Sequence, residues 1–151
     1  MTPGTGRIAQ TAAASDPATM NADELAIMSI KLVKARYMEC INEKLWDGLV
    51  ECLTPDASVA YENGRHTFFG RDDIIDYLRD NLALLDAIHI ASNPRIALID
   101  ESTARGMWDL RFQWHDPWDN TSLHGAGVYS DRYVRHGGAW QISFTGFVLT
   151  S

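Results

Sequence analysis

The chain has 151 residues, a length that suits one compact domain better than two. Its hydrophobic content of 46% and charged content of 22% are those of a globular protein, which excludes wholesale disorder and a collagen-like or coiled-coil composition. With 13 basic and 20 acidic residues the formal net charge is −7, so the chain has no general attraction for nucleic acid or for an anionic membrane surface.

Residues 1–20 have the character of a flexible leader, because proline and glycine interrupt them and no continuous apolar run marks a secretory signal. The remainder, residues 21–151, is expected to form a single domain. No apolar run is long enough to cross a bilayer. Cys40 and Cys52 are too few to staple a fold of this size, so we expect buried free thiols and a cytoplasmic location.

Three helices are predicted in the first half of the domain. Asn21 followed by Glu24 is a capping signal, and the apolar stripe behind it places Tyr37 on the inward face of the first helix. A shorter helix from Trp46 ends before Thr54, and a third helix runs to Leu85. Between the last two, residues 58–61 and 65–69 flank a Glu-Asn-Gly turn and are read as a hairpin.

The second half is predicted to be strands near residues 88–99, 103–115, 122–135 and 139–149. Short turns between successive strands favour antiparallel pairing. The expected architecture is therefore an α+β cone, in which a strongly curved, antiparallel or mixed sheet of about six strands wraps around three helices from the N-terminal half.

Familiar catalytic motifs are missing: the sequence has no Gly-rich phosphate loop before a helix, no HExxH and no GxSxG. Of the five histidines, His66, His115 and His136 are expected in solvent, none shows metal-binding spacing, and the facing of His124 is left open. His89 stands at a helix-strand junction between two isoleucines. It is either a hydrogen-bonded core residue or a neutral imidazole that serves as a general base in an apolar cavity.

The stretch from Ala104 to Trp114 alternates apolar and polar residues, which places Trp108 and Phe112 on one face of a strand and Asp109 on the other. If that face lines a closed cone, the cavity suits a flat hydrophobic small molecule; a packed core or a subunit interface is the alternative.

The order of the predicted elements and several of these residues resemble a known protein family. The order of elements resembles the SnoaL-like branch of the nuclear transport factor 2-like superfamily, and within it the bacterial bile-acid 7α-dehydratases. The similarity covers about residues 25–149 and is most specific from Arg36 to Trp46 and in the strand ending at Trp108. The resemblance implies a dimer or a trimer.

The resemblance also implies site residues. A tyrosine and a histidine of those dehydratases stand at the positions of Tyr37 and His89, but two carboxylates and a late arginine are replaced by Asn42, Phe112 and Leu149. The tyrosine and histidine of the resemblance are therefore retained, whereas the two carboxylates and the arginine are absent. This pattern favours an altered substrate or position of attack.

The leading hypothesis is a hydro-lyase, without metal or organic cofactor, that acts on a steroid, bile-acid-like or other polycyclic hydroxyketone. His89 is the predicted base, Tyr37 a hydrogen-bond donor and Asn42 a polar orienting partner. The predicted cavity-shaping residues are Trp46, Tyr61, Trp108, Phe112 and Tyr129. A double-bond isomerase of the same substrates and a non-catalytic binder of hydrophobic ligands remain as alternatives.

Overall fold

The structure is a computed structural model that describes residues 19–150. Its helical elements are α2 (Ala22–Glu43), the 3₁₀ turn η2 (Trp46–Gly48), α3 (Leu49–Cys52) and α4 (Arg71–Leu82). Its strands are β1 (Leu53–Tyr61), β2 (His66–Phe69), β3 (Asp86–Leu98), β4 (Thr103–Asp116), β5 (Thr121–His136) and β6 (Ala139–Leu149). The predicted α+β class is confirmed.

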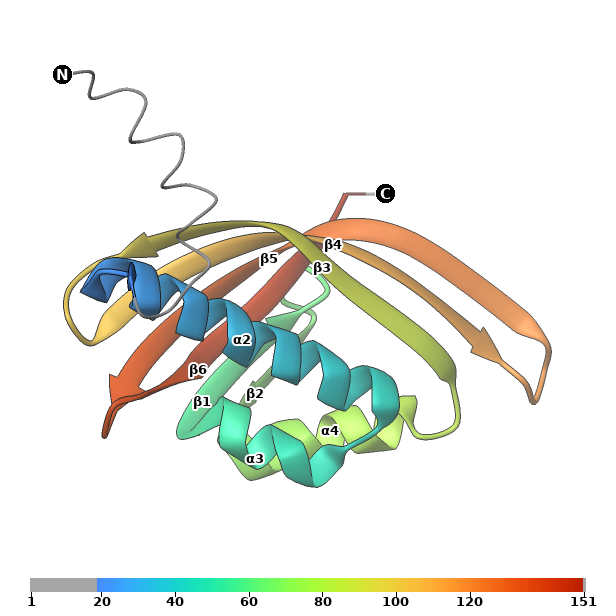
Figure 1. Ribbon diagram of the computed structural model, residues 1–151. Coiled ribbons are helices and arrows are strands. Elements are labelled where there is room, and N and C mark those ends of the chain that lie inside the picture. Colours follow the sequence, from blue (N-terminus) through green and yellow to red (C-terminus); the bar gives the residue numbers. More distant parts are fainter. Residues whose placement is uncertain (1–18, 151) are drawn as a thin grey trace, which may run out of the picture.

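All six strands form one sheet in the order β2-β1-β6-β5-β4-β3. Every neighbouring pair is antiparallel except β1 and β6, which run parallel. Parallel strands need a long connection, and the whole middle of the chain supplies it here. Figure 1 shows the sheet arching over α2, with α3 and α4 gathered near β1 and β2. The mixed, curved sheet agrees with the prediction.

The first helix begins where the sequence predicts. The Asn21 side chain accepts a hydrogen bond from the Glu24 backbone N–H at 2.8 Å, and the Glu24 carboxylate accepts one from the Asn21 N–H at 3.1 Å. This reciprocal capping box satisfies two of the donors that a helix leaves free at its start. The inward stripe packs against β3 and β6, with Tyr37 and Ile41 buried.

Two junctions between a helix and the following strand differ from the prediction. The short second helix ends at Cys52, and β1 starts at once at Leu53, so Pro55 lies inside a strand. The pairing of β1 with β6 shifts register between Leu53 and Ser58, and this irregularity accommodates a proline that has no N–H to give. The third helix stops at Leu82 instead of Leu85, and β3 begins at Asp86.

The alternation predicted for the Trp-containing strand is confirmed in β4. Trp108 and Leu110 are buried on the inner face, whereas Arg105 and Met107 are exposed. Asp109 lies on the opposite face, where its carboxylate accepts a hydrogen bond from Arg95 at 3.0 Å. The inner face of β4 therefore supplies apolar surface without charge.

The structure also bears on the expectations for the cysteines, for membrane-spanning segments and for the N-terminal leader. Cys40 and Cys52 are both buried and free, as predicted. Within residues 19–150 no helix combines the length and the hydropathy that crossing a membrane requires. The predicted leader, residues 1–20, lies outside the described residues except for its last two positions.

Candidate functional site

A cavity of about 260 Å³ opens between α2, α4 and the inner face of the sheet. Its wall is mostly aromatic and aliphatic. The lining residues are Tyr37, Ile41, Tyr61, Glu62, Tyr77, Leu78, Asn81, Leu82, Leu85, His89, Leu110, Phe112, Trp114, Tyr129 and Phe147. Five predicted site residues, Tyr37, Tyr61, His89, Phe112 and Tyr129, are thus brought to one cavity by α2 and four different strands.

Two predicted cavity residues do not line this cavity. Trp46 starts the 3₁₀ turn η2 and packs, partly buried, against the core. Trp108 is buried, and its indole N–H donates to the hydroxyl of Tyr133 at 3.1 Å. The strand parity of Trp108 was predicted correctly, but its indole bonds to Tyr133, and the cavity residues of β4 are Leu110, Phe112 and Trp114.

His89 lies on β3 opposite Phe112 of β4, and the two rings stack with centroids 6.1 Å apart. Its Nδ1 is one of three buried side-chain polar atoms in the described chain that lack a hydrogen-bond partner. Burial disfavours the imidazolium and lowers the pKa of His89 from 6.5 to about 4. At neutral pH the ring is therefore uncharged and can accept a proton.

Asn42 contacts the backbone of His89 instead of its ring. The Asn42 amide N–H donates to the His89 carbonyl, and its amide oxygen accepts from the His89 N–H, both at 2.8 Å. This pair of bonds joins the end of α2 to β3. Asn42 thus fixes the position of the residue that carries the imidazole, and no side chain orients the imidazole itself through Nδ1.

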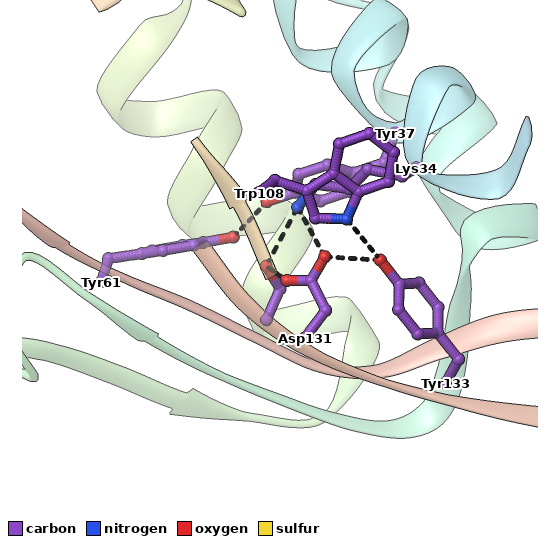
Figure 2. Close-up of polar contacts among 7 residues, drawn as sticks. Lys34, Tyr37, Tyr61, Trp108, Asp131 and Tyr133 are labelled. Carbon is purple, nitrogen blue, oxygen red and sulfur yellow. Dashed lines mark hydrogen bonds and ion pairs between the residues drawn. The ribbon is translucent and has the colours of Figure 1, made fainter. Parts of the chain in front are cut away.

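The hydroxyls of Tyr37 and Tyr61 are 2.7 Å apart and share one hydrogen bond, as Figure 2 shows. Burial is the main cause that raises the pKa of each phenol, so both stay protonated at neutral pH. Each phenol carries one proton, and the hydrogen bond between the two hydroxyls uses only one of these two protons. The second proton is therefore available to a ligand oxygen in the cavity.

Behind these phenols lies a buried ion pair that the sequence reasoning missed. Lys34 Nζ is 2.9 Å from a carboxylate oxygen of Asp131, and both side chains are fully buried. Asp131 also accepts hydrogen bonds from Tyr133 at 2.7 Å and from Thr145 at 2.6 Å. Figure 2 shows Lys34 and Tyr133 beside the carboxylate. Its charge is compensated on every side.

The ion pair reaches the cavity through an aromatic ring. Lys34 Nζ lies 3.5 Å from the centroid of the Tyr129 ring and 5.0 Å from that of Tyr37. Desolvation lowers the pKa of Lys34, and the neighbouring Asp131 opposes that shift. The arrangement holds the two tyrosines that line the cavity against a fixed cation.

Sequence signals for this network were present. Lys34 occupies the inward stripe of α2, four residues after Ile30 and three before Tyr37. Asp131 stands between Tyr129 and Tyr133 at period two on β5. A charged residue on each of two inward faces predicts a buried pair, because a lone buried charge is too costly.

The other histidines do not line the cavity. His115 Nδ1 bonds to the Ser122 hydroxyl at 2.8 Å, and both His115 and the exposed His124 border a groove at the far ends of β4 and β5. His66 is 39% exposed on the hairpin strand β2. Among the described residues, no three His, Cys, Asp or Glu side chains gather into a metal-binding group.

The model of the SnoaL-like domain family matches residues 23–145, and the chain belongs to this family. The solved structure of LinA is similar, with a TM-score of 0.79 and 20% identity over 86% of this chain and 89% of that one. A structure titled as a putative scytalone dehydratase from Novosphingobium aromaticivorans has a TM-score of 0.79 and 18% identity, covering 86% of this chain and 87% of that one.

A third similar structure is hexachlorocyclohexane dehydrochlorinase LinA-type3 from Novosphingobium barchaimii, with a TM-score of 0.78 and 19% identity over 86% of this chain and 90% of that one. At these identities the similarity establishes the shared fold.

Proposed function

We propose that the protein is a cofactor-independent hydro-lyase that eliminates water from a polycyclic hydroxyketone. The observation that carries the proposal is an uncharged imidazole, His89, lining the same aromatic cavity as the hydrogen-bonded phenols Tyr37 and Tyr61. A base and a proton donor in one cavity are the two groups that an elimination of water requires. The SnoaL-like family and the dehydratase and dehydrochlorinase named among the similar structures support a lyase role.

The reaction can be written with the groups of the cavity. Nε2 of His89 accepts a proton from a carbon acidified by a conjugated ketone, since Nδ1 is buried. The electron pair of that C–H bond forms the new double bond while the C–O bond breaks. The departing hydroxyl takes the Tyr37 proton and leaves as water, and the imidazolium then returns a proton to the tyrosine. The substrate loses one water and the protein is unchanged.

The environment of His89 restricts the substrate. A pKa of about 4 makes the imidazole a weak base at neutral pH, because general bases work best when their pKa is close to the working pH. Desolvation alone shifts the pKa of His89, with no carboxylate among the described residues opposing it. Asn42, at the position that the resemblance to bile-acid 7α-dehydratases makes acidic, bonds to the His89 backbone instead. The C–H bond that is broken must therefore be strongly activated, as in an enone whose conjugation reaches the leaving group.

The shape of the cavity gives a further restriction. His89 pairs with Phe112 on β4, whereas Tyr129 pairs with Trp108, four residues along the same strand or about 13 Å away. His89 and Tyr129, whose ring lies against Lys34, are thus carried at opposite ends of the cavity. An elongated, flat ligand spans this distance. The volume of about 260 Å³ is just below the roughly 300 to 1,000 Å³ of drug-sized sites, so a steroid would extend beyond the opening.

Purified protein incubated with hydroxylated 3-oxo-4-ene steroids and with smaller bicyclic hydroxyenones tests the proposal by mass spectrometry. We expect a product lighter by one water, and His89→Ala should slow its formation by about 10² to 10⁴. An undiminished rate in His89→Ala would disprove the role of the imidazole. A product of unchanged mass identifies the isomerase alternative.

A second candidate function is a non-catalytic binder of the same ligands. The observation that favours it is the unpartnered Nδ1, since no side chain supports a charge on the ring. It predicts saturable ligand binding with no product after long incubation.

A further inference from the structure

The cavity wall has one ionised side chain, and it lies in the hairpin turn between β1 and β2. Glu62 is the only residue among those lining the described cavity that carries a formal charge at neutral pH. Its side chain is 43% exposed. A residue that both lines the cavity and meets solvent stands at the opening, where a ligand enters or extends outward.

The backbone at Glu62 is one that glutamate rarely adopts. Its φ is 52°, and Asn63 and Gly64 follow with φ of 61° and 85°, so three successive residues are left-handed. Glycine takes this conformation without cost and asparagine tolerates it, whereas glutamate has no such preference. Strained backbone of this kind is concentrated at ligand and catalytic sites. The turn therefore keeps a carboxylate where backbone preference alone would favour another residue.

The turn is also held firmly in place. The Asn63 N–H donates to the Phe147 carbonyl at 3.0 Å, and the Asn63 side chain accepts from the Leu149 N–H at 2.8 Å. Both bonds attach the turn to the end of β6, and Phe147 itself lines the cavity. The backbone that carries Glu62 is thus anchored at the opening.

No lysine or arginine among the residues that line the cavity neutralises the Glu62 carboxylate. His66 lies 3.4 Å away and is charged only when protonated, while Arg65 follows in the turn but does not line the cavity. The Lys34 ammonium is neutralised by Asp131, and Lys44 donates to the Ala83 carbonyl outside this wall. A ligand leaving the cavity therefore passes a negative charge.

From this geometry we propose that Glu62 is a specificity-determining residue that admits uncharged ligands with a hydroxyl or amide donor at their outer end and rejects anionic ones. The inference rests on the cavity being the ligand site of the proposed function, and it names the substrate class. A carboxylate accepts hydrogen bonds and repels another carboxylate or a phosphate. A free steroid acid or a coenzyme A thioester, which bears phosphates, would then be a poor ligand.

Binding of a matched pair of probes tests the proposal without requiring turnover. Fluorescence titrations with 2-naphthamide and 2-naphthoate compare the wild type with Glu62→Gln, which keeps the side-chain shape and removes the charge. We expect the wild type to prefer the amide by about fivefold, the effect of one like charge near the surface, and Glu62→Gln to lose most of that preference by gaining affinity for the naphthoate.

Two further variants keep the result interpretable. Glu51→Gln removes an exposed carboxylate on α3 outside the cavity and should leave the preference unchanged. Glu62→Gly removes the charge and relieves the left-handed strain, so it should show the same gain for naphthoate with a higher melting temperature. An unchanged preference in both Glu62 variants would overturn the proposal, as would failure of both probes to bind the wild type. If the protein binds the amide selectively but dehydrates none of the hydroxyenones, the proposal for Glu62 stands and the proposed hydro-lyase activity is refuted.

Discussion

The interior of this protein holds two polar groups in contrasting circumstances. Asp131 accepts from Lys34, Tyr133 and Thr145, so the buried carboxylate is fully satisfied. His89, on strand β3, keeps a buried ring nitrogen, Nδ1, that has no hydrogen-bond partner among residues 19–150. Folded proteins satisfy nearly all of their buried polar atoms, because each one left unpaired costs stability.

The contrast separates structure from function. A saturated network such as that of Asp131 locks helix α2 to strands β5 and β6 and gives nothing to a ligand. The buried, unpartnered Nδ1 of His89 lowers stability, while the other ring nitrogen, Nε2, is the atom that the proposed chemistry uses. Substitutions in the two regions should therefore have different consequences.

The largest expected effect is on the satisfied network. Lys34→Met leaves the Asp131 charge buried without its cation, which should lower the free energy of unfolding by about 3 to 5 kcal/mol. The double variant Lys34→Met with Asp131→Asn removes both charges and should recover part of that loss. Urea denaturation of the two variants measures the difference. A double variant no more stable than Lys34→Met would contradict the account of a compensated pair.

The second largest effect is expected at His89, whose burial makes the free energy of unfolding depend on pH. Its pKa is about 4 when folded and 6.5 in the reference state, so the unfolded chain binds more protons between these values. Stability from this group is therefore complete above pH 6.5 and is lost as the pH falls toward 4, by at most about 1.4 kcal/mol per pH unit. Acid denaturation series should show a shallower slope for His89→Leu than for the wild type. His136→Leu, at an exposed position, is the control, and an equal slope in all three proteins would refute the burial of a neutral imidazole.

A smaller effect is expected where the two regions meet, at Asn42. Asn42→Asp introduces the carboxylate that the sequence resemblance leads us to expect at this position, but loses the N–H that binds the His89 carbonyl, placing two acceptors 2.8 Å apart. We expect a loss of about 2 kcal/mol in stability and no gain in turnover. Asn81→Asp, which removes a matching 2.8 Å bond to the Tyr77 carbonyl at an exposed site, should cost less. A faster enzyme in Asn42→Asp would show that the amide does not act through the backbone.

Local patterns predicted the helices and the alternation of β4, since these depend on the 3.6-residue and two-residue periods. The choice of Tyr37 and His89 as site residues rested on the family resemblance, and the predicted Trp46 and Trp108 do not line the cavity. Local patterns could not show that Asn42 bonds to a strand 47 residues away, because spacing fixes a helix face and not the atoms opposite it. The role of Glu62 was hidden for a similar reason: its position depends on the hydrogen bonds of Asn63 to β6. The Lys34–Asp131 pair, by contrast, follows from the sequence in principle, because each charged residue lies on the inward face of its element.

The most direct test is nuclear magnetic resonance of the His89 ring nitrogens, assigned by comparison with His89→Ala, in a titration from pH 8 to pH 4 with and without a hydroxyenone ligand. The account predicts an imidazole that remains neutral throughout the neutral range and whose nitrogen resonances move when the ligand binds. A His89 that is protonated at pH 7, or whose resonances ignore a bound ligand, would contradict it.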